Sequence, residues 1–190
     1  MIRLENICKE FDGRPVLQNF SLHAAPGERV CLTGESGCGK STLLSIAAGG
    51  LLPDSGEVFI RNGAKKAFLF QNDRLLPWLN ALENITVTGA SEKSAMEMLE
   101  KMGIAEDFNK LPAQLSGGMS RRLAIARVLA YGGDIYYLDE PLQGLDEATA
   151  EKVIEVLRQE LEGKTVLMVS HINSEISALA TRTIELKRIY

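Results

Sequence analysis

The chain has 190 residues, of which 45% are apolar and 24% charged, and its formal net charge is −4. This composition excludes a disordered tail, a collagen-like chain and a long coiled coil, and the length favours one domain. No apolar run reaches the roughly 18 residues of a membrane span, the start MIRLENICKE holds no signal peptide, and no basic segment could neutralise a nucleic-acid backbone. The three cysteines have no metal-site spacing, so we expect reduced thiols, a cytoplasmic location and no nucleic-acid partner.

The first third of the chain is predicted to hold several strands and one helix. Alternating apolar residues predict strands at 2–4 and 16–22, and the short apolar run 30–33 is typical of a buried strand. A glycine-rich turn from Gly34 then leads into the good helix formers of 41–48. The predicted order is therefore strand, glycine-rich loop, helix.

A tight turn is predicted between the two apolar runs that follow this helix. Asn62 and Gly63 both tolerate a positive φ, and together they form the strongest short hairpin signal. We therefore expect residues 57–61 and 64–70 to pair as an antiparallel hairpin.

The middle of the chain, from 72 to about 131, is predicted to be helical. Ala95, Met98, Leu99 and Met102 follow the spacing i, i+3, i+4, i+7 of one helix face. Such a stripe is more typical of a buried core face than of a methionine-lined binding surface, so we expect it to be buried.

The last third returns to alternating strands and helices. Strands are predicted at 135–138 and 165–169, with a helix from about 148 to 161 between them and Asp146 as its possible N-cap. Residues 183–190 are predicted to form an edge strand.

The pattern along the whole chain predicts one α/β domain over residues 1–190. Its core is expected to comprise about 1–71 and 132–190, with 72–131 as a helical insertion. No internal repeat and no Pro- or Ser-rich linker divides the sequence.

The glycine-rich loop is predicted to bind phosphate. Residues 34–41, GESGCGKS, match G-x-x-x-x-G-K-[ST] in full, between a predicted strand and a predicted helix. The glycines allow the main chain to curl its N–H groups toward phosphate oxygens, Lys40 can reach the outer phosphates, and the Ser41 hydroxyl can bind Mg²⁺. The alternative is a turn that only reverses the chain. The predicted binding residues are Gly34, Glu35, Ser36, Gly37, Cys38, Gly39, Lys40, Ser41 and Thr42.

Cys38 lies inside this loop, where we expect its side chain to face away from phosphate. It is either an inert thiol or a reactive one, and the inert thiol is favoured. The main chain of Cys38, rather than its side chain, is therefore the group expected to contribute to binding.

Two carboxylates end a predicted buried strand in the run IYYLDE. Because ligands bind at the carboxyl ends of strands in such sheets, Asp139 can hold Mg²⁺ and Glu140 can polarise an attacking water. The alternative is a strand that ends in a solvated acidic turn.

In order and spacing these elements resemble the nucleotide-binding subunit of ATP-binding cassette (ABC) transporters. Beyond the loop and the carboxylate pair, the resemblance rests on Gln71, LSGGM at 115–119, EPLQGLD at 140–146 and SH at 170–171. It implies an α/β fold with a P-loop NTPase mixed-sheet core, an N-terminal antiparallel β subdomain and an inserted α-helical subdomain. It also implies ATP and Mg²⁺ as cofactors.

The LSGGM segment has a local and a family interpretation. Ser116, Gly117 and Gly118 precede an apolar-periodic helix, so they present a hydroxyl and N–H groups at a helix start, where anions bind, or they form only a helix cap. The resemblance implies that they close over the ATP of a second subunit in a head-to-tail dimer. Asp146 is included among the nucleotide-binding residues on the same grounds.

Three further residues take candidate roles. The Gln71 amide could touch the metal or the water. By resemblance His171 contacts the γ-phosphate and orients Glu140, and Phe11 stacks on adenine. A structural histidine and core packing of the phenylalanine are the respective alternatives.

The segment NDRLLPW at 72–78 resembles the ATPases of importers for nitrate, sulfonates and thiamine precursors. Trp78 is a candidate contact for a membrane subunit, although partly buried packing is the more frequent role of such a residue. Met119 stands where the family more often has Gln, and Ile172 where it more often has Asp, so neither supplies an extra polar contact.

The resemblance implies a Mg-ATP hydrolase that powers solute transport, with import favoured. Its implied partners are a second ATPase subunit, a transmembrane permease and, indirectly, a solute-binding protein. The expected location is the cytoplasmic face of the membrane, through the permease. The alternatives are an ATPase that regulates a membrane complex without transport and a non-hydrolysing ATP-dependent binding module.

Overall fold

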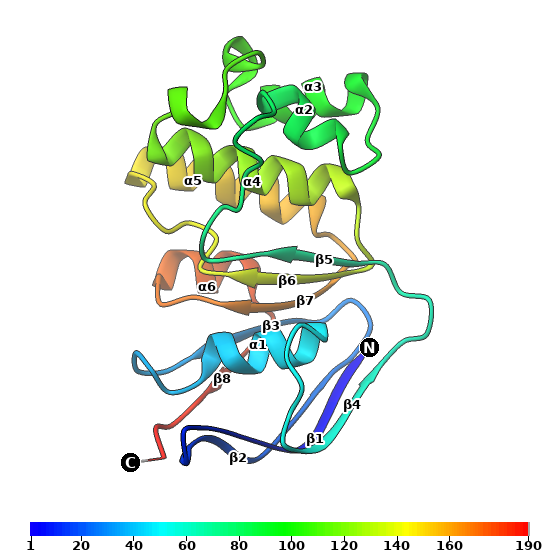
Figure 1. The fold of residues 1–190 in the computed structure, drawn as a ribbon, viewed down its shortest axis with the longest axis vertical. Helices are drawn as coiled ribbons and strands as arrows, with labels where there is room; N and C mark the ends of the chain where they lie inside the picture. The colour runs from blue at the N-terminus through cyan, green and yellow to red at the C-terminus, as the bar shows by residue number, and fades with distance from the viewer. Residues whose placement is uncertain (190) are drawn as a thin grey trace.

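The computed structural model describes residues 1–189, and its strands form two sheets (Figure 1). In the first sheet β1 (Ile2–Phe11) lies between β2 (Arg14–Ala24) and β4 (Ser55–Ile60), and both pairings are antiparallel. Apolar side chains alternate along β1, which buries one face of this sheet as the sequence predicts.

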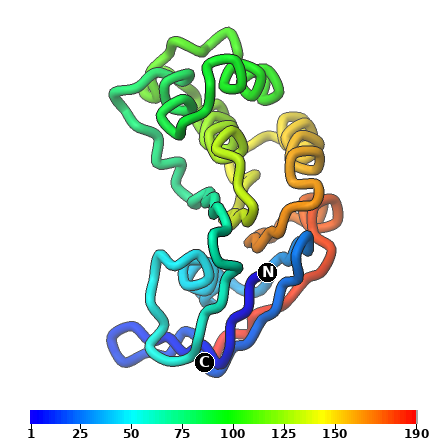
Figure 2. The backbone as a smooth tube through the Cα atoms, turned by 90° about the vertical axis from the view of Figure 1, so that its right-hand side faces the viewer, coloured from blue at the N-terminus to red at the C-terminus, as the bar shows by residue number. Residues whose placement is uncertain are grey.

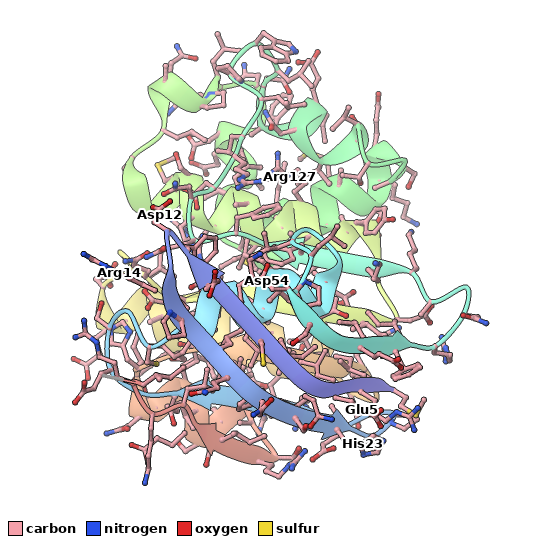
Figure 3. All side chains as sticks on the ribbon, turned by 60° about the horizontal axis from the view of Figure 1, so that its bottom comes forward. Glu5, Asp12, Arg14, His23, Asp54 and Arg127 are labelled. Carbon is pink, nitrogen blue, oxygen red and sulfur yellow. The ribbon has the colours of Figure 1, made fainter. Side chains whose placement is uncertain are left out.

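The turn between β1 and β2 lies at one end of this sheet. Figure 3 labels Asp12 and Arg14 there, and Glu5 and His23 at the other end. Phe11, the last residue of β1, directly precedes this turn, so the turn places its ring near the site described below.

The second sheet has five strands in the order β5-β6-β7-β3-β8, and every described pairing is parallel. Its strands are β3 (Arg29–Thr33), β5 (Lys66–Leu69), β6 (Ile135–Asp139), β7 (Thr165–Val169) and β8 (Arg182–Glu185). The α/β class with an antiparallel subdomain is thereby confirmed. The predicted edge strand is also present but shorter than expected, and residue 190 lies outside the described residues.

The segment around Asn62 and Gly63 departs from the prediction. The turn exists, because Gly63 has a φ of +71° and the Ala64 N–H donates to the Arg61 carbonyl at 3.1 Å. However, β4 pairs with β1 and β5 pairs with β6. The predicted hairpin is therefore wrong. The turn instead carries the chain from one sheet to the other, because a local turn signal does not specify which strand edge supplies the partner.

Helices cover both faces of the parallel sheet. Figure 1 shows α4 and α5 on one face, with α1 on the other, between the two sheets. Helix α1 confirms the predicted helix after the glycine-rich loop, whereas α6 was not predicted. The bounds are α1 (Lys40–Ala48), α4 (Gly117–Tyr131), α5 (Glu147–Glu160) and α6 (Asn173–Leu179).

The helical segment contains α2 (Ala81–Thr86), α3 (Glu92–Lys101), two short 3₁₀ turns and α4. The predicted apolar face of α3 is buried, which confirms that its methionines belong to the core. In Figure 2 this green segment and the blue N-terminal strands lie at opposite ends of the molecule. No helix within residues 1–189 combines the length and apolarity needed to cross a bilayer.

Strand β6 separates two apolar cores. Tyr136 and Leu138 pack with the helical segment, whereas Ile135 and Tyr137 pack with α1 and the antiparallel sheet, as the two-residue period of a strand requires. The Tyr137 hydroxyl donates to the Ala47 carbonyl at 2.9 Å, so the buried ring keeps a polar partner. This double packing fixes the position of the carboxyl end of β6.

Candidate active site

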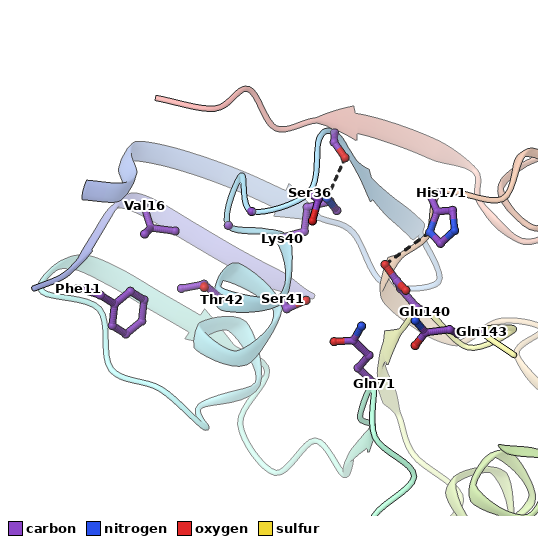
Figure 4. A pocket seen from close by; sticks show the side chains of 13 residues that line it. Phe11, Val16, Ser36, Lys40, Ser41, Thr42, Gln71, Glu140, Gln143 and His171 are labelled. Atoms are coloured by element: carbon purple, nitrogen blue, oxygen red, sulfur yellow. Dashed lines mark hydrogen bonds and ion pairs between the residues drawn. The ribbon is translucent and has the colours of Figure 1, made fainter. Parts of the chain in front are cut away.

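A pocket of about 700 Å³ lies where α1 begins, beside the carboxyl ends of the parallel strands (Figure 4). It brings together residues from β1 to the segment after β7, as expected of the ligand crevice of an α/β sheet. Its lining consists of Phe11, Val16, Gly34, Ser36, Gly37, Gly39, Lys40, Ser41, Thr42, Gln71, Glu140, Gln143 and His171.

The glycine-rich loop has a main-chain shape that other residues could not adopt. Gly34 has a φ of +133°, and a Cβ there would lie 2.2 Å from the Leu186 carbonyl oxygen. Gly39 has a φ of +100°, and a Cβ there would lie 2.9 Å from the Val16 side chain. Both conformation and space therefore require glycine, which favours the phosphate cradle over a simple chain reversal.

The start of α1 faces the pocket. Gly39 is the N-cap and no side chain caps the helix, while Lys40, Ser41 and Thr42 form the first turn and line the pocket. Unpaired N–H groups and the helix dipole make such a turn favourable for an anion. The Lys40 ammonium donates to the carbonyls of Gly34 at 2.8 Å and Glu35 at 2.7 Å, which places its charge over the loop.

Two residues of the predicted loop set do not line the pocket. Glu35 contributes its carbonyl to Lys40. Cys38 is 3% exposed and belongs to the core between the antiparallel sheet and α1, so its thiol faces away from the pocket as expected. This burial favours the inert thiol over the reactive one.

A hydroxyl of the pocket lining meets a buried carboxylate, Asp139, which does not itself line the pocket. The Ser41 hydroxyl donates to Asp139 Oδ1 at 3.1 Å, which joins α1 to the end of β6. Burial raises the pKa of the Asp139 carboxyl, and the hydrogen bond from Ser41 opposes this shift. Gln71 points into the same space (Figure 4). Hydroxyl, carboxylate and amide oxygens are ligand types that Mg²⁺ accepts, so these three residues fit a magnesium ion.

Glu140 follows Asp139 in an unusual backbone conformation. Its φ is +47°, and its N–H donates to the Val169 carbonyl at 2.9 Å. The conformation turns its side chain into the pocket, where Oε1 lies 3.5 Å from His171 Nδ1 (Figure 4). A non-glycine residue in this region is strained and persists where the surroundings hold it, and such positions concentrate at functional sites.

Phe11 and Trp78 are more exposed than core packing of Phe11 or partial burial of Trp78 would require. Phe11 is 45% exposed and lines the end of the pocket away from Glu140, so it is not a core residue (Figure 4). Trp78 is 70% exposed, so the interpretation as partly buried packing is wrong. Both rings are thus accessible to a ligand or a partner.

The LSGGM segment and Asp146 lie outside the pocket lining. Ser116 is the N-cap of α4, and its hydroxyl accepts from the Met119 N–H at 3.2 Å, so the local cap interpretation is confirmed. Asp146 caps α5 by accepting from the Thr149 N–H at 3.0 Å, and this bond lowers the pKa of its carboxyl. Within one chain these residues therefore have structural roles.

Some residues of the site were not among those predicted from the sequence. Val16 and Gln143 line the pocket, and only the EPLQGLD segment could have pointed to Gln143. Behind His171, the Ser170 hydroxyl donates to the buried Glu175 carboxylate at 2.5 Å. No spacing in the sequence indicates that pair, because it depends on the unpredicted helix α6.

Comparisons with known proteins place the chain in a family. The family model described as ABC transporter matches residues 17–143. The chain is 39% identical to the aliphatic sulfonates import ATP-binding protein SsuB of Cupriavidus necator, over 96% of this chain and 65% of that protein. It is 36% identical to the taurine import ATP-binding protein TauB of Yersinia pestis, over 95% of this chain and 77% of that protein. The chain thus spans just under two thirds of the length of SsuB.

Solved structures give the same result. The dimeric, post-hydrolysis structure of the ATP-binding cassette MJ0796 bound to ADP and Pi is 33% identical, with a TM-score of 0.89 over 100% of this chain and 97% of that one. A second dimeric structure of that bacterial ABC transporter cassette is 35% identical, with a TM-score of 0.90 over 99% and 95% of the two chains. The resemblance predicted from the motifs is confirmed, and the chain belongs to the ABC transporter family.

Proposed function

We propose that this chain binds Mg-ATP and hydrolyses it as the motor subunit of an ABC importer. The observation that carries the proposal is the convergence of the glycine-rich loop, the Ser41–Asp139 pair and the strained Glu140 on one pocket. A cradle for phosphates and a carboxylate aimed at the same space are the parts that phosphoryl transfer to water requires.

The chain's own residues would act as follows. The N–H groups at the start of α1 and the Lys40 ammonium bind the β- and γ-phosphates of ATP. Ser41, Asp139 and Gln71 would hold Mg²⁺, which when bound supplies positive charge to the phosphate oxygens. At the other end of the pocket, the exposed ring of Phe11 would stack on adenine.

Glu140 is proposed as the general base. Its carboxylate orients a water and accepts a proton as the water oxygen bonds to the γ-phosphorus and the bond to the β-phosphate oxygen breaks. His171, 3.5 Å from Glu140, would hold the carboxylate in place and donate to a γ-phosphate oxygen.

A second subunit is proposed to complete the site. Ser116, Gly117 and Gly118 do not line the chain's own pocket, yet they form an exposed or half-exposed helix start that suits an anion. A head-to-tail dimer would place them, with Asp146 nearby, over the partner's ATP. The dimeric state of the similar solved cassettes supports this arrangement.

The remaining partners are proposed from the relatives and from exposed surface. The similar proteins SsuB and TauB are named as import ATP-binding proteins, which supports a transmembrane permease and, indirectly, a solute-binding protein as partners. Exposed Trp78, near Gln71 in the chain, is the proposed permease contact. This assembly would hold the chain at the cytoplasmic face of the membrane.

The proposal is tested by separating ATP binding from ATP turnover. Glu140→Gln should retain Mg-ATP affinity by calorimetry and lower phosphate release about 10²- to 10⁴-fold, because it removes the proton acceptor. Lys40→Ala should instead abolish detectable binding, because it removes the mobile charge that contacts the phosphates.

Lys152→Ala, at an exposed position on α5, is the control and should match the parent in both measurements. Mg-ATP binding without any turnover by the parent chain would indicate a nucleotide-dependent binding module instead. Unchanged affinity in Lys40→Ala would remove the phosphate cradle itself.

A further inference from the structure

Arg121 lies in the second turn of α4, points toward the ends of β5 and β6, and is only 3% exposed. All three nitrogens of its guanidinium donate hydrogen bonds. A buried charge is costly unless it is paired and hydrogen-bonded, and here the pairing is nearly all with main-chain carbonyls. Two of these carbonyls belong to Gln71 and Glu140, which line the pocket.

One side of the guanidinium holds the segment that contains the proposed base. Nη2 donates to the carbonyls of Asp139 at 2.8 Å and Glu140 at 2.6 Å, and Nε donates to the Pro141 carbonyl at 2.9 Å. Three successive carbonyls thus converge on one rigid, planar group. Because the Glu140 N–H is also bound, by Val169, the main chain is fixed on both sides of its strained φ.

The other side of the guanidinium holds the segment after β5. Nη1 donates to the carbonyls of Phe70 at 2.8 Å and Gln71 at 3.2 Å, and to Asp73 Oδ1 at 3.0 Å. The Asp73 carboxylate supplies the opposite charge. The same side chain therefore fixes the main chain of Gln71 and that of Glu140, whose side chains approach the pocket from two different strands.

We infer that Arg121 is a positioning residue for ATP hydrolysis, which sets the spacing between Glu140 and Gln71 by binding the carbonyls of both segments. The inference rests on the proposed function. Arg121 touches neither nucleotide nor water, and it acts through main-chain geometry. It also joins these segments to α4, the helix that Ser116 begins, so the orientation of that helix start and the position of Glu140 are linked by one side chain.

An arginine away from the pocket provides a control. Arg182 on β8 donates to Glu28 Oε1 at 2.7 Å and to the His23 main-chain carbonyl, and none of these residues lines the pocket. Arg121→Lys and Arg182→Lys therefore keep the charge, and each removes the contacts of one guanidinium. Only the contacts of Arg121 reach Glu140.

The experiment measures kcat, the Kd for Mg-ATP and the melting temperature of the full chain and its variants. Arg121→Lys should lower kcat about 10- to 100-fold with Kd within about threefold, because a misplacement near 1 Å at the reacting group costs this much without weakening the phosphate contacts. Arg182→Lys should keep kcat within about threefold, even if its melting temperature falls as much as that of Arg121→Lys.

Three outcomes overturn the inference. They are a parental kcat in Arg121→Lys, an equal loss of kcat in the two lysine variants, and a loss of Mg-ATP affinity that accounts for the whole loss of activity. If Arg121→Lys does not fold, Arg121→Gln keeps a shorter, neutral donor that can reach only part of the carbonyl set, and a parental kcat in that variant also overturns the inference. Failure of the proposed function is distinguishable, because then the parent chain itself shows no turnover.

Discussion

Two glutamates close to the pocket differ in their contact with water. Glu140 is partly exposed and faces the pocket, whereas Glu175 on α6 is fully buried. One Glu175 oxygen accepts from the Ser170 hydroxyl at 2.5 Å, and the other has no hydrogen-bond partner among the described residues. Burial raises the pKa of Glu175 to about 7, and the Ser170 bond opposes the shift only in part. This carboxyl therefore keeps its proton to a higher pH in the folded chain than in the unfolded chain.

This pKa predicts that the Glu175 carboxyl lowers stability as pH rises. In the unfolded chain the Glu175 carboxyl has a pKa of about 4.3. Between that pH and the higher pKa of the folded chain, the carboxyl is ionised in the unfolded chain and protonated in the folded chain. The free energy of unfolding therefore falls as pH rises, by up to about 1.4 kcal/mol per pH unit. Glu175→Gln removes this contribution. Urea unfolding from pH 5 to 7 should thus give a flatter decline for Glu175→Gln than for the parent.

The exposed Glu151 on α5 supplies the control for this measurement. Glu151→Gln should reproduce the parental pH dependence, because it removes a carboxylate from the exposed face of α5 and leaves the buried Ser170–Glu175 pair intact. Identical slopes for the parent and Glu175→Gln would show that the buried carboxyl does not hold a proton at neutral pH.

At the scale of single residues, the sequence predicted what local patterns encode. The loop 34–41 could be identified because its glycines, Lys40 and Ser41 occur at fixed offsets. Arg121 and Glu175 could not, because the importance of both arises from burial, and that of Arg121 also from partners up to 51 residues away in the chain. The contact of Ser41 with Asp139 was accessible only through the rule that strand ends converge.

At the scale of the elements, helices α1 and α4 both begin beside small residues, but the free N–H groups of their first turns are satisfied in different ways. Helix α1 has no side-chain cap and turns its first N–H groups to the pocket, whereas α4 is capped by the Ser116 hydroxyl. The cap does not exclude a role for Ser116 toward a second subunit. The two roles make different predictions for substitution, since a cap needs only an acceptor oxygen.

Ser116→Asp separates the two roles. Aspartate is as good an N-cap as serine, so the melting temperature should stay within a few degrees of the parent. If Ser116 contacts a partner's nucleotide, the added negative charge should lower turnover by about 10-fold or more while the chain alone still binds Mg-ATP.

Ser91→Asp, at the N-cap of α3, is the matched control because that serine accepts from the Ser94 N–H at 3.2 Å in the same way. It should leave both stability and turnover unchanged. Parental turnover in Ser116→Asp would mean that the LSGGM segment is a helix cap only.

Strands and helices were predicted correctly where burial determines the sequence pattern. The prediction of strand pairing failed where distant segments of the chain supply the partner strands. The strands 135–138 and 165–169 were predicted almost to the residue, because both are buried runs between polar turns. The hairpin at 57–70 was wrong because β1 and β6, far away in the sequence, supply the partners of its two strands. Helix α6 was missed because it has only seven residues and no side-chain cap.

At the scale of the whole molecule, the pocket lies between two packed units. The core of α1 and the antiparallel sheet supplies the phosphate loop and Phe11, while the helical segment adjoins Gln71 and carries Ser116. The pocket lining contains no residue of the LSGGM segment, so in the proposed head-to-tail dimer one chain would supply only part of the contacts to a triphosphate. The division into these two units follows from β6, which packs a different face against each.

This incomplete site predicts that ATP turnover depends on protein concentration. If a second chain must supply its LSGGM segment, the active species is a dimer, and association has an entropic cost that dilute chains do not overcome. The rate of phosphate release per subunit should therefore rise with concentration and approach a plateau as the dimer becomes dominant, with a parallel rise in scattering mass when ATP is present.

A permease that binds two copies would raise their effective concentration and bring dilute chains to that plateau. The same effect can be imposed without the permease. Two copies joined in one chain by a flexible Gly/Ser linker should turn over ATP at a rate per site that no longer depends on concentration, because the second binding event has become intramolecular.

A tandem chain in which one copy carries Ser116→Asp and the other Lys40→Ala is the decisive control. In a head-to-tail dimer these two changes fall in the same composite site, so one site stays intact and about half of the turnover should remain, whereas placing both changes in one copy affects both sites and should abolish turnover. Equal rates for the two arrangements, or a rate per subunit that stays flat on dilution of the single chain, would show that each chain carries a complete site.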